Sequence, residues 1–383
     1  MIGFETPEGV SDELFREYRI KEDVLKRINN VFKSYGYKRV ATPTIEYYEV
    51  FSSIKSTVLK DEMFKLIDNS GEILTLRPDA TIPIARIVAK NYKKEKGNYK
   101  IFYSNQVFKM KSESKRERTQ TGIEYFGNPN AEADGEVIVN AIEALKNCNV
   151  EFKIEIGNAG YYKGLLDEID IDDSIKEILK NLIEYKNFVE LKSYVNSLNL
   201  DNRIKNAIIE MPNLYGEYSE VLKRAEEYSI NSRMKKSLEE LNKIYEFIED
   251  YGYSEYISID LGIINDLDYY TGVVFKGYLA NYGDSILSGG RYDNLTEYYG
   301  ESIPATGFAI SVDDLISGIE SQRDFKEEEY YSVDYRVNYK EEDRKKAIEK
   351  AKELRKKNFV VELQKIDEFS NLDSDYVKNI INI

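Results

Sequence analysis

A long helical stretch separates two regions of β-strand pattern in this chain. Residues 165–250 contain amphipathic helical patterns such as SLEELNKIYEFIEDYG, with few alternations of β-branched residues. Strand patterns precede this stretch and return after it, in YISIDLGIINDLDYYTGVVFKGYL and DSILSGGRYDNL. The order predicts one α+β core, an antiparallel sheet flanked by helices, that carries residues 165–250 as a helical insertion.

Turn and cap signals divide the first strand region into elements. Residues 12–35 have apolar side chains at helical spacing and end at Gly36, which predicts a helix. In YKRVATPTIEYYEVF, Pro43 cannot donate a hydrogen bond to a sheet, so we expect an edge or interface strand. NSG at residues 69–71 predicts a hairpin turn, and Asp79 is placed to cap the helix that follows.

The C-terminal residues are expected to form a separate small unit. The core would span residues 1–320, and the polar segment SQRDFKEEEY would follow it as a linker. Residues 331–383 contain one strand pattern (SVDYRV), a basic amphipathic helix (EEDRKKAIEKAKELRKKN) and a second strand (FVVELQ), which predicts an α/β unit. The basic helix could contact RNA, but a solvated face with i,i+4 ion pairs is the simpler interpretation.

Composition limits the chemistry that is available. The chain has no histidine, which excludes Ser-His-Asp and Cys-His machinery and removes the commonest metal ligand, so we expect no metal site. Compositional drift would explain this absence, and so would an advantage in controlling histidine supply without needing histidine. The net charge of −15 argues weakly against nucleic acid, because a local basic groove would still be possible.

Cys148 and the start of the chain suggest a location. A single cysteine cannot form an internal disulfide and fits a reducing cytoplasm. Cys148 ends an apolar helix pattern, so we expect a structural role rather than a catalytic thiol. The first residues lack a basic region followed by an apolar one, and no apolar run has spanning length. The sequence therefore predicts a cytoplasmic protein outside the membrane.

Four segments in order resemble the histidyl-tRNA synthetase family: TLRPDAT at 75–81, TQTGIEYFG at 119–127, LDYYTGVVF at 267–275 and LSGGRYDNL at 287–295. The similarity covers roughly the first 320 residues, with a helical insertion in the expected place. YGYKRVATPTIEYYEVF resembles the family's motif 1, which builds a dimer interface around its proline. The resemblance implies a class II aminoacyl-tRNA synthetase-like fold, a homodimer core and a truncated anticodon-binding domain at residues 331–383.

The family's amino-acid pocket is retained in this resemblance. The positions that match its histidine-binding residues are Asp79, Thr81, Gln120, Glu124, Tyr269 and Tyr270. Gln120, Gly122 and Glu124 alternate along a strand, so they share one face, and Gly122 leaves room for a ligand. A buried carboxylate needs donors or a cation, which a ligand ammonium and imidazole N–H would supply.

Interpretations without a ligand site also stay open for these residues. Asp79 would serve only as a helix cap, and the acids would lie at the surface. Gly289 and Gly290 form either a plain bulge or a close approach of the backbone to a ligand.

The family's ATP-binding groups, by contrast, are degenerate. The matching positions are Lys109, Lys111, Asn265 and Asp314. A lysine keeps the charge of an arginine but lacks its bidentate fork, and Asp314 puts an anion where an anionic ligand would sit. Because one lost positive group costs on the order of 3 kcal/mol in catalysis, we expect no adenylate formation and no catalytic residues. Asn265 also removes the arginine that supports the ligand carboxylate.

A synthetase-like chain without ATP groups resembles the regulatory subunit of ATP phosphoribosyltransferase. The resemblance implies a subunit that is not an enzyme and has no aminoacylation activity, but that a short-form catalytic subunit requires for the first step of histidine biosynthesis. It also implies histidine as feedback effector, a hetero-octamer, and neither cofactor, membrane nor tRNA. The alternatives are an active histidyl-tRNA synthetase and a synthetase-like regulator that binds tRNA or another protein.

Overall fold

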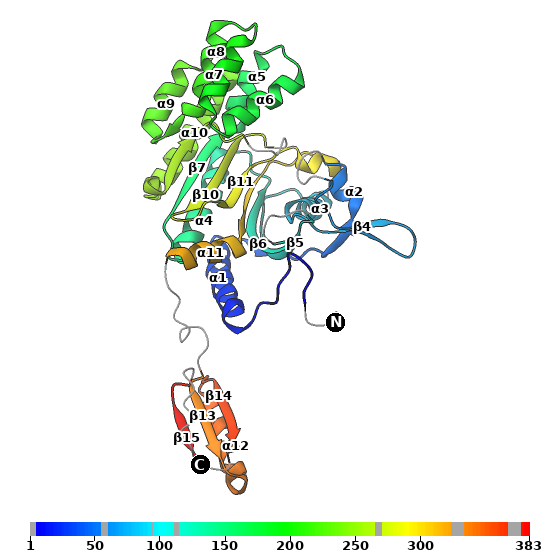
Figure 1. Ribbon diagram of the computed structural model, residues 1–383, viewed down its shortest axis with the longest axis vertical. Helices are drawn as coiled ribbons and strands as arrows, with labels where there is room; N and C mark the ends of the chain where they lie inside the picture. Colours follow the sequence, from blue (N-terminus) through cyan, green and yellow to red (C-terminus); the bar gives the residue numbers. More distant parts are fainter. Residues whose placement is uncertain are drawn as a thin grey trace. The chain divides into compact units, whose positions relative to one another are not determined.

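The computed structural model describes residues 5–54, 60–92, 95–110, 115–264, 270–322, 333–366 and 377–383. The chain divides into two compact units (Figure 1). One consists of residues 1–11 and 24–322, and the other of residues 12–23 and 323–383. Helix α1 (Phe15–Ser34) contributes residues to both units. It begins within one turn of the start of the helix expected from residues 12–35.

The first unit is built on a mixed sheet, nine-stranded within the described residues, in the order β1-β5-β6-β12-β11-β10-β7-β9-β8. Neighbouring strands are antiparallel except β1 with β5 and β7 with β9. The α+β prediction is therefore confirmed, with parallel pairs only toward the two ends of the sheet. The strands are β1 (Lys38–Arg39), β5 (Tyr99–Phe108), β6 (Glu117–Phe126), β7 (Phe152–Asn158), β8 (Tyr215–Gly216), β9 (Ile257–Asp260), β10 (Val273–Leu279), β11 (Ser285–Arg291) and β12 (Ala305–Ser311).

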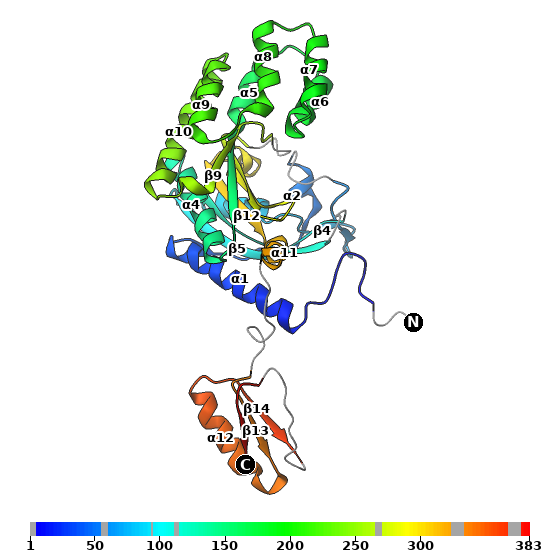
Figure 2. The same ribbon diagram turned by 60° about the vertical axis from the view of Figure 1, so that its left-hand side comes forward.

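Alternation along the strands gives this sheet an apolar face and a face with polar groups. On the first face lies α1, drawn in blue in Figure 2. The ring of its Phe32 contacts Phe102 and Phe308, with ring centroids 6.0 and 5.8 Å apart. Helices α4 (Ala131–Asn147) and α11 (Val312–Gln322) also pack on the sheet. Successive strand residues point to opposite faces, so Tyr103 and Glu124 lie on the other face, where α3 (Thr81–Tyr92) begins.

The helical insertion is confirmed and begins slightly earlier than predicted (the green helices of Figure 1). It packs tightly against the core: a Cβ on Gly135 of α4 would lie 2.6 Å from the ring of Phe247. The insertion also contains β8, which was not predicted and pairs with β9. Its helices are α5 (Ala159–Asp167), α6 (Asp173–Glu184), α7 (Phe188–Ser197), α8 (Asn202–Glu210), α9 (Tyr218–Glu227) and α10 (Ser232–Asp250).

A second, three-stranded sheet has the order β2-β4-β3, from β2 (Ile45–Tyr47), β4 (Ile73–Leu76) and β3 (Lys65–Ile67). The predicted hairpin is β3 and β4, and its Gly71 has φ +89°, a left-handed conformation that favours glycine. The edge position expected here is confirmed, since β1 and β2 each lie at the edge of a sheet, but the segment forms two strands in different sheets and not one. The Arg77 guanidinium fixes this break by donating to the carbonyls of Thr42 (2.6 Å) and Pro43 (3.2 Å).

In the second unit, β13 (Tyr335–Tyr339) lies between β14 (Val361–Lys365) and β15 (Ile380–Asn382) in a parallel sheet. Two of these strands and α12 (Arg344–Lys356) were predicted, whereas β15 was missed. Val337, Ala351 and Leu354 are part of its apolar core. On the exposed side of the helix, Glu353 pairs with Lys350 and Lys357, each at 2.9 Å, in agreement with a solvated, ion-paired face.

Two observations bear on the expectations from composition. Cys148 is buried at the end of α4, in agreement with a structural role. No helix in the described ranges combines the length and the apolar character needed to span a bilayer.

Candidate functional site

Two glycines shape the polar face of the main sheet. The strand register places Val274, Gly290, Gly307 and Glu124 in one row across β10, β11, β12 and β6. A Cβ on Gly307 would collide with the Glu124 carboxylate, and one on Gly290 would lie 2.7 Å from the Tyr270 ring. Both side chains therefore lie over backbone that only glycine can provide. The pairing through Gly290 is regular, so the bulge interpretation is wrong at this position.

The Glu124 side chain projects from this face and is 2% exposed. The Thr81 hydroxyl donates to one carboxylate oxygen at 2.8 Å, and the Tyr292 hydroxyl donates to the other. Burial raises the pKa of Glu124 to about 8, opposed by these two hydrogen bonds and reinforced by nearby Asp79. The carboxyl is therefore mostly protonated at neutral pH, and a ligand cation or imidazole N–H would favour its ionised form.

Asp79 and Thr81 are brought to Glu124 by the start of α3. The Asp79 carboxylate accepts a hydrogen bond from the Ile82 backbone N–H at 3.1 Å, so the predicted cap is confirmed. Burial also raises the pKa of Asp79. Because this carboxylate acts on the pKa of Glu124, the cap lies within electrostatic range of the candidate pocket. Capping and ligand binding are thus compatible roles for one side chain.

Gln120 lies further along the same face of β6, between Asn105 of β5 and Ser311 of β12. A buried polar atom of each of these side chains has no hydrogen-bond partner among the described residues: Gln120 Oε1, Asn105 Nδ2 and Ser311 Oγ. The Tyr103 hydroxyl, opposite Gly122, is in the same condition. Buried polar groups are normally paired, so four unpaired groups on one sheet face indicate a place for water or a ligand.

The other end of this face, near the predicted position Asp314, is filled by ion pairs. The Arg118 guanidinium lies 3.2 Å from the Asp314 carboxylate, which also accepts a hydrogen bond from Tyr282 at 3.1 Å. Asp313 beside it accepts from the Thr119 backbone N–H at 2.6 Å and pairs with Lys115 at 3.1 Å. Asp314 is therefore a neutralised anion, which the sequence had not indicated.

The remaining predicted positions are partly described. Lys109 is half-exposed, with its Nζ 3.9 Å from Glu62. Lys111, Asn265 and Tyr269 lie outside the described residues.

Two residues that hydrogen-bond or pair with site residues were not predicted, although the alternation of side chains along a strand pointed to each. Tyr292 follows Gly290 at an interval of two, and Arg118 precedes Gln120 at the same interval. Applying the period of two to Tyr292 within LSGGRYDNL, and to Arg118 just before TQTGIEYFG, would have put both on this face.

A buried ion-pair network anchors the segment after Tyr270. Arg291 Nε lies 2.9 Å from Asp134, and Nη1 lies 3.1 Å from Asp293. Thr271 is tied to the same network, since its backbone N–H donates to the Arg291 carbonyl at 2.7 Å. Burial raises the pKa of Asp134 to about 6, while Arg291 opposes the shift. The network therefore fixes the backbone directly after Tyr270.

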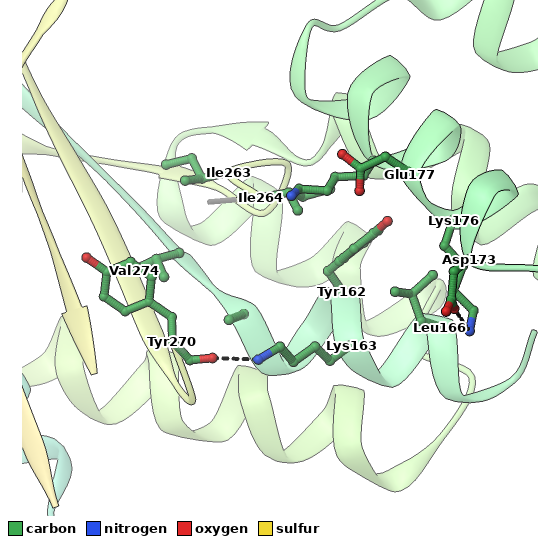
Figure 3. Close-up of a pocket in the computed structure, with 12 residues that line it drawn as sticks. Tyr162, Lys163, Leu166, Asp173, Lys176, Glu177, Ile263, Ile264, Tyr270 and Val274 are labelled. Atoms are coloured by element: carbon green, nitrogen blue, oxygen red, sulfur yellow. Dashed lines mark hydrogen bonds and ion pairs between the residues drawn. The ribbon is translucent and has the colours of Figure 1, made fainter. Parts of the chain in front are cut away.

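Tyr270 also borders a cavity of about 430 Å³ between the insertion and β10 (Figure 3). The Lys163 ammonium of α5 donates to the Tyr270 carbonyl at 2.6 Å. Of the predicted pocket residues that the structure describes, Tyr270 alone lines this cavity. The cavity thus borders Tyr270, whereas Glu124 does not line it.

Comparison with known proteins gives a consistent result. A family model described as histidyl-tRNA synthetase matches residues 9–315. A Clostridium botulinum protein named ATP phosphoribosyltransferase regulatory subunit is 40% identical over 94% of this chain and 86% of its own. A Bacillus halodurans structure, described as an ATP phosphoribosyltransferase regulatory subunit/histidyl-tRNA synthetase, superposes with TM-score 0.89 at 34% identity, over 99% of this chain and 98% of its own. A Nostoc histidyl-tRNA synthetase shares the fold at TM-score 0.82 and 22% identity, over 97% and 88% of the two chains.

Proposed function

The chain belongs to the ATP phosphoribosyltransferase regulatory subunit family, which has the histidyl-tRNA synthetase fold, and we propose that it is a non-catalytic subunit through which histidine regulates a short catalytic subunit. The observation that carries the proposal is the contrast on one sheet face. Glu124 is buried and hydrogen-bonded to the neutral hydroxyls of Thr81 and Tyr292, whereas Asp314 is held in an ion pair.

The proposed histidine site uses the side chains around Glu124. The imidazole N–H would donate to the Glu124 carboxylate, taking the place of the Thr81 or Tyr292 hydroxyl. The ammonium would bind Asp79 and the unpaired Gln120 Oε1. Tyr269 and Tyr270 would close the pocket. A cation next to two carboxylates whose pKa values are raised by burial would favour their ionised forms, which supports the assignment.

The absence of catalysis is proposed from the nucleotide half. A triphosphate there would approach Asp314 and would compete with it for Arg118. Lys109 replaces the arginine that binds phosphate through two parallel hydrogen bonds in the family, and Lys111 replaces the family's glutamate, which reverses the charge at that position. Neither adenylate formation nor specific tRNA binding is expected.

An exposed apolar sheet face supports the proposed homodimer core. Ile45 and Tyr47 of β2 are 51% and 59% exposed, and Leu66 of β3 is 41% exposed. The register aligns Leu66 and Tyr47 with Leu74 on β4, and Leu76 is opposite Ile45, so all five side chains share one face. A contiguous apolar surface of this kind is typical of a subunit interface. The larger assembly, a hetero-octamer, would add the catalytic subunits to this dimer.

Regulation in this proposal follows from differential affinity. Histidine can shift the complex between an active and an inhibited conformation only by the ratio of its affinities for the two. The effector would therefore bind more tightly when the catalytic subunit is in its inhibited state.

Reconstitution tests the proposal. The chain is mixed with a short-form catalytic subunit, and phosphoribosyl-ATP synthesis is measured with and without histidine. We expect the chain to raise the rate and histidine to suppress it. Glu124→Ala should still raise the rate but should respond weakly to histidine. A catalytic subunit whose rate is the same with and without this chain would contradict the proposal.

Two assays separate the alternative functions. Histidine-dependent pyrophosphate exchange at normal rates would indicate an active synthetase. A specific complex with tRNA at physiological salt, seen as a gel shift, would indicate an RNA-binding regulator. We expect neither result.

A further inference from the structure

We propose that the cavity between α5, α6 and β10 is a second ligand site, which binds a small organic anion. The cavity of about 430 Å³ lies within the size range of small-molecule sites. It shares Tyr270 with the proposed histidine pocket, but Glu124, Thr81 and Gln120 do not line it. The inference concerns binding alone and does not depend on the proposed function.

A buried hydroxyl faces this cavity without a partner. Tyr162 of α5 is 7% exposed, and its hydroxyl has no hydrogen-bond partner among the described residues. Figure 3 shows the ring pointing from α5 across the cavity toward α6. Burial, and then the charges of Glu177 and Glu184, raise the pKa of Tyr162, so the hydroxyl keeps its proton and can donate it. An acceptor oxygen of a ligand would satisfy this group.

The charges around the cavity favour an anion. Three lysines line it, Lys163, Lys176 and Lys180, and each is partly buried. The two carboxylates in the lining are on the outside: Glu177 is exposed, and the Asp173 side chain is 99% exposed. Lys176 is paired with Asp173 at 3.1 Å, and because solvent screens the exposed carboxylates, an anion in the cavity would meet the ammonium groups of Lys163 and Lys180.

The rest of the lining sets the size and character of the ligand. Ala159, Ile263 and Val274 form an apolar surface, and Lys163 is held toward it by the Tyr270 carbonyl. A carboxylate or phosphate would bind among the lysines and the Tyr162 hydroxyl, with its carbon skeleton on the apolar side. Both anions present the same chemistry to this site, namely two or three acceptor oxygens with negative charge.

Calorimetric titration of the full chain tests the proposal, with ribose 5-phosphate, inorganic phosphate and citrate as probes at constant ionic strength. We expect saturable binding of at least one probe, and the phosphate and citrate arms separate the two sources of negative charge. Tyr162→Phe removes only the hydroxyl, and Lys180→Gln removes one charge. Each should weaken binding of that probe about tenfold, the effect of one lost hydrogen bond to a charged group.

Two control variants make the result decisive. Lys192→Ala, on the exposed surface of α7, should bind the probe as the unmodified chain does. Glu124→Ala should also retain the probe while losing histidine, so that failure of this inference differs from failure of the proposed function. Absence of saturable binding for every probe would overturn the proposal. Equal affinities in Tyr162→Phe, Lys180→Gln and Lys192→Ala would overturn it as well.

Discussion

At the two ends of one sheet face, a carboxylate is stabilised by different kinds of partner. Glu124, at one end, is almost completely buried, and its hydrogen-bond donors among the described residues are the neutral hydroxyls of Thr81 and Tyr292. Asp314, at the other end, is partly exposed and is paired with a full positive charge on Arg118. Neutral donors leave a carboxylate site that can still attract a cation, whereas an ion pair leaves little net charge for a ligand.

This difference determines which ligand can enter without losing interactions. A ligand N–H at Glu124 exchanges one hydrogen bond for another and gains charge assistance. A phosphate near Asp314 must separate an existing pair and approach an anion.

Glu124→Ala should have the largest consequence, because a buried charged partner of the ligand is lost. At a hundredfold excess over Kd, histidine should stabilise the unmodified chain by roughly 2.7 kcal/mol, and the variant should show almost none of this. The histidine-induced rise in Tm measures the effect. Glu155→Ala is the matched control, since it removes a partly buried carboxylate from β7 outside the pocket. A rise that is the same in both variants would refute the assigned site.

The pH dependence of stability should separate the two ends next. The pKa of Glu124 is raised to about 8 in the folded chain and lies near 4.5 in the unfolded chain. The folded chain therefore keeps a proton that the unfolded chain releases, and stability falls as the pH rises through this window, by about 1.4 kcal/mol per unit. Between pH 5 and 7 the group should contribute a loss of roughly 2 to 3 kcal/mol.

Urea unfolding at pH 5 and 7 measures this loss, with Glu124→Gln as the comparison. The variant should lose less stability than the unmodified chain over this interval. Asp134, whose pKa is raised to about 6, titrates in both proteins and cancels in the difference. Parallel stability curves for the two proteins would mean that Glu124 is ionised throughout the interval.

Two tyrosine substitutions compare the neutral donors directly. Tyr292→Phe removes a buried donor to Glu124 and should destabilise the ligand-free chain by about 1 to 2 kcal/mol. Tyr282→Phe removes a donor to Asp314 at a position with partial exposure, where water replaces the hydroxyl, and should change stability by less than about 0.5 kcal/mol. Chemical denaturation of both variants at pH 7 gives the difference. Equal losses would remove the distinction between the two ends.

The sequence predicted the parts of the fold in which apolar residues recur at a regular spacing or turn residues mark a boundary. Strands β5 and β6, the hairpin at Gly71 and the helical insertion follow from alternation, turn residues and helical spacing. The missed strands β8 and β15 have two and three residues, which is too short for any period to appear. The break at Pro43 depends on the Arg77 side chain, 34 residues away in the chain, and no local pattern contains that contact.

The candidate site was predictable to a similar degree. Asp79, Thr81, Gln120 and Glu124 come from two short motifs, and the structure brings Asp79 and Thr81 within reach of Glu124. The hydroxyl of Tyr292 reaches Glu124 from a third segment, because strand register and not sequence distance sets this contact. The pairing of Arg118 with Asp314 likewise joins residues 196 positions apart. Such partners become visible only once the sheet is assembled.

Asp314→Asn should also give a small change. The Arg118–Asp314 pair is partly exposed, so its removal should alter the free energy of unfolding by less than about 1 kcal/mol, and less still in 0.5 M salt. Asp313→Asn is the matched comparison, because that buried carboxylate also accepts the Thr119 backbone N–H and should be more costly to replace. A large loss in Asp314→Asn that salt does not reduce would mean that the pair acts as a buried charge. The nucleotide end would then resemble the Glu124 end in its dependence on burial, and the comparison would fail.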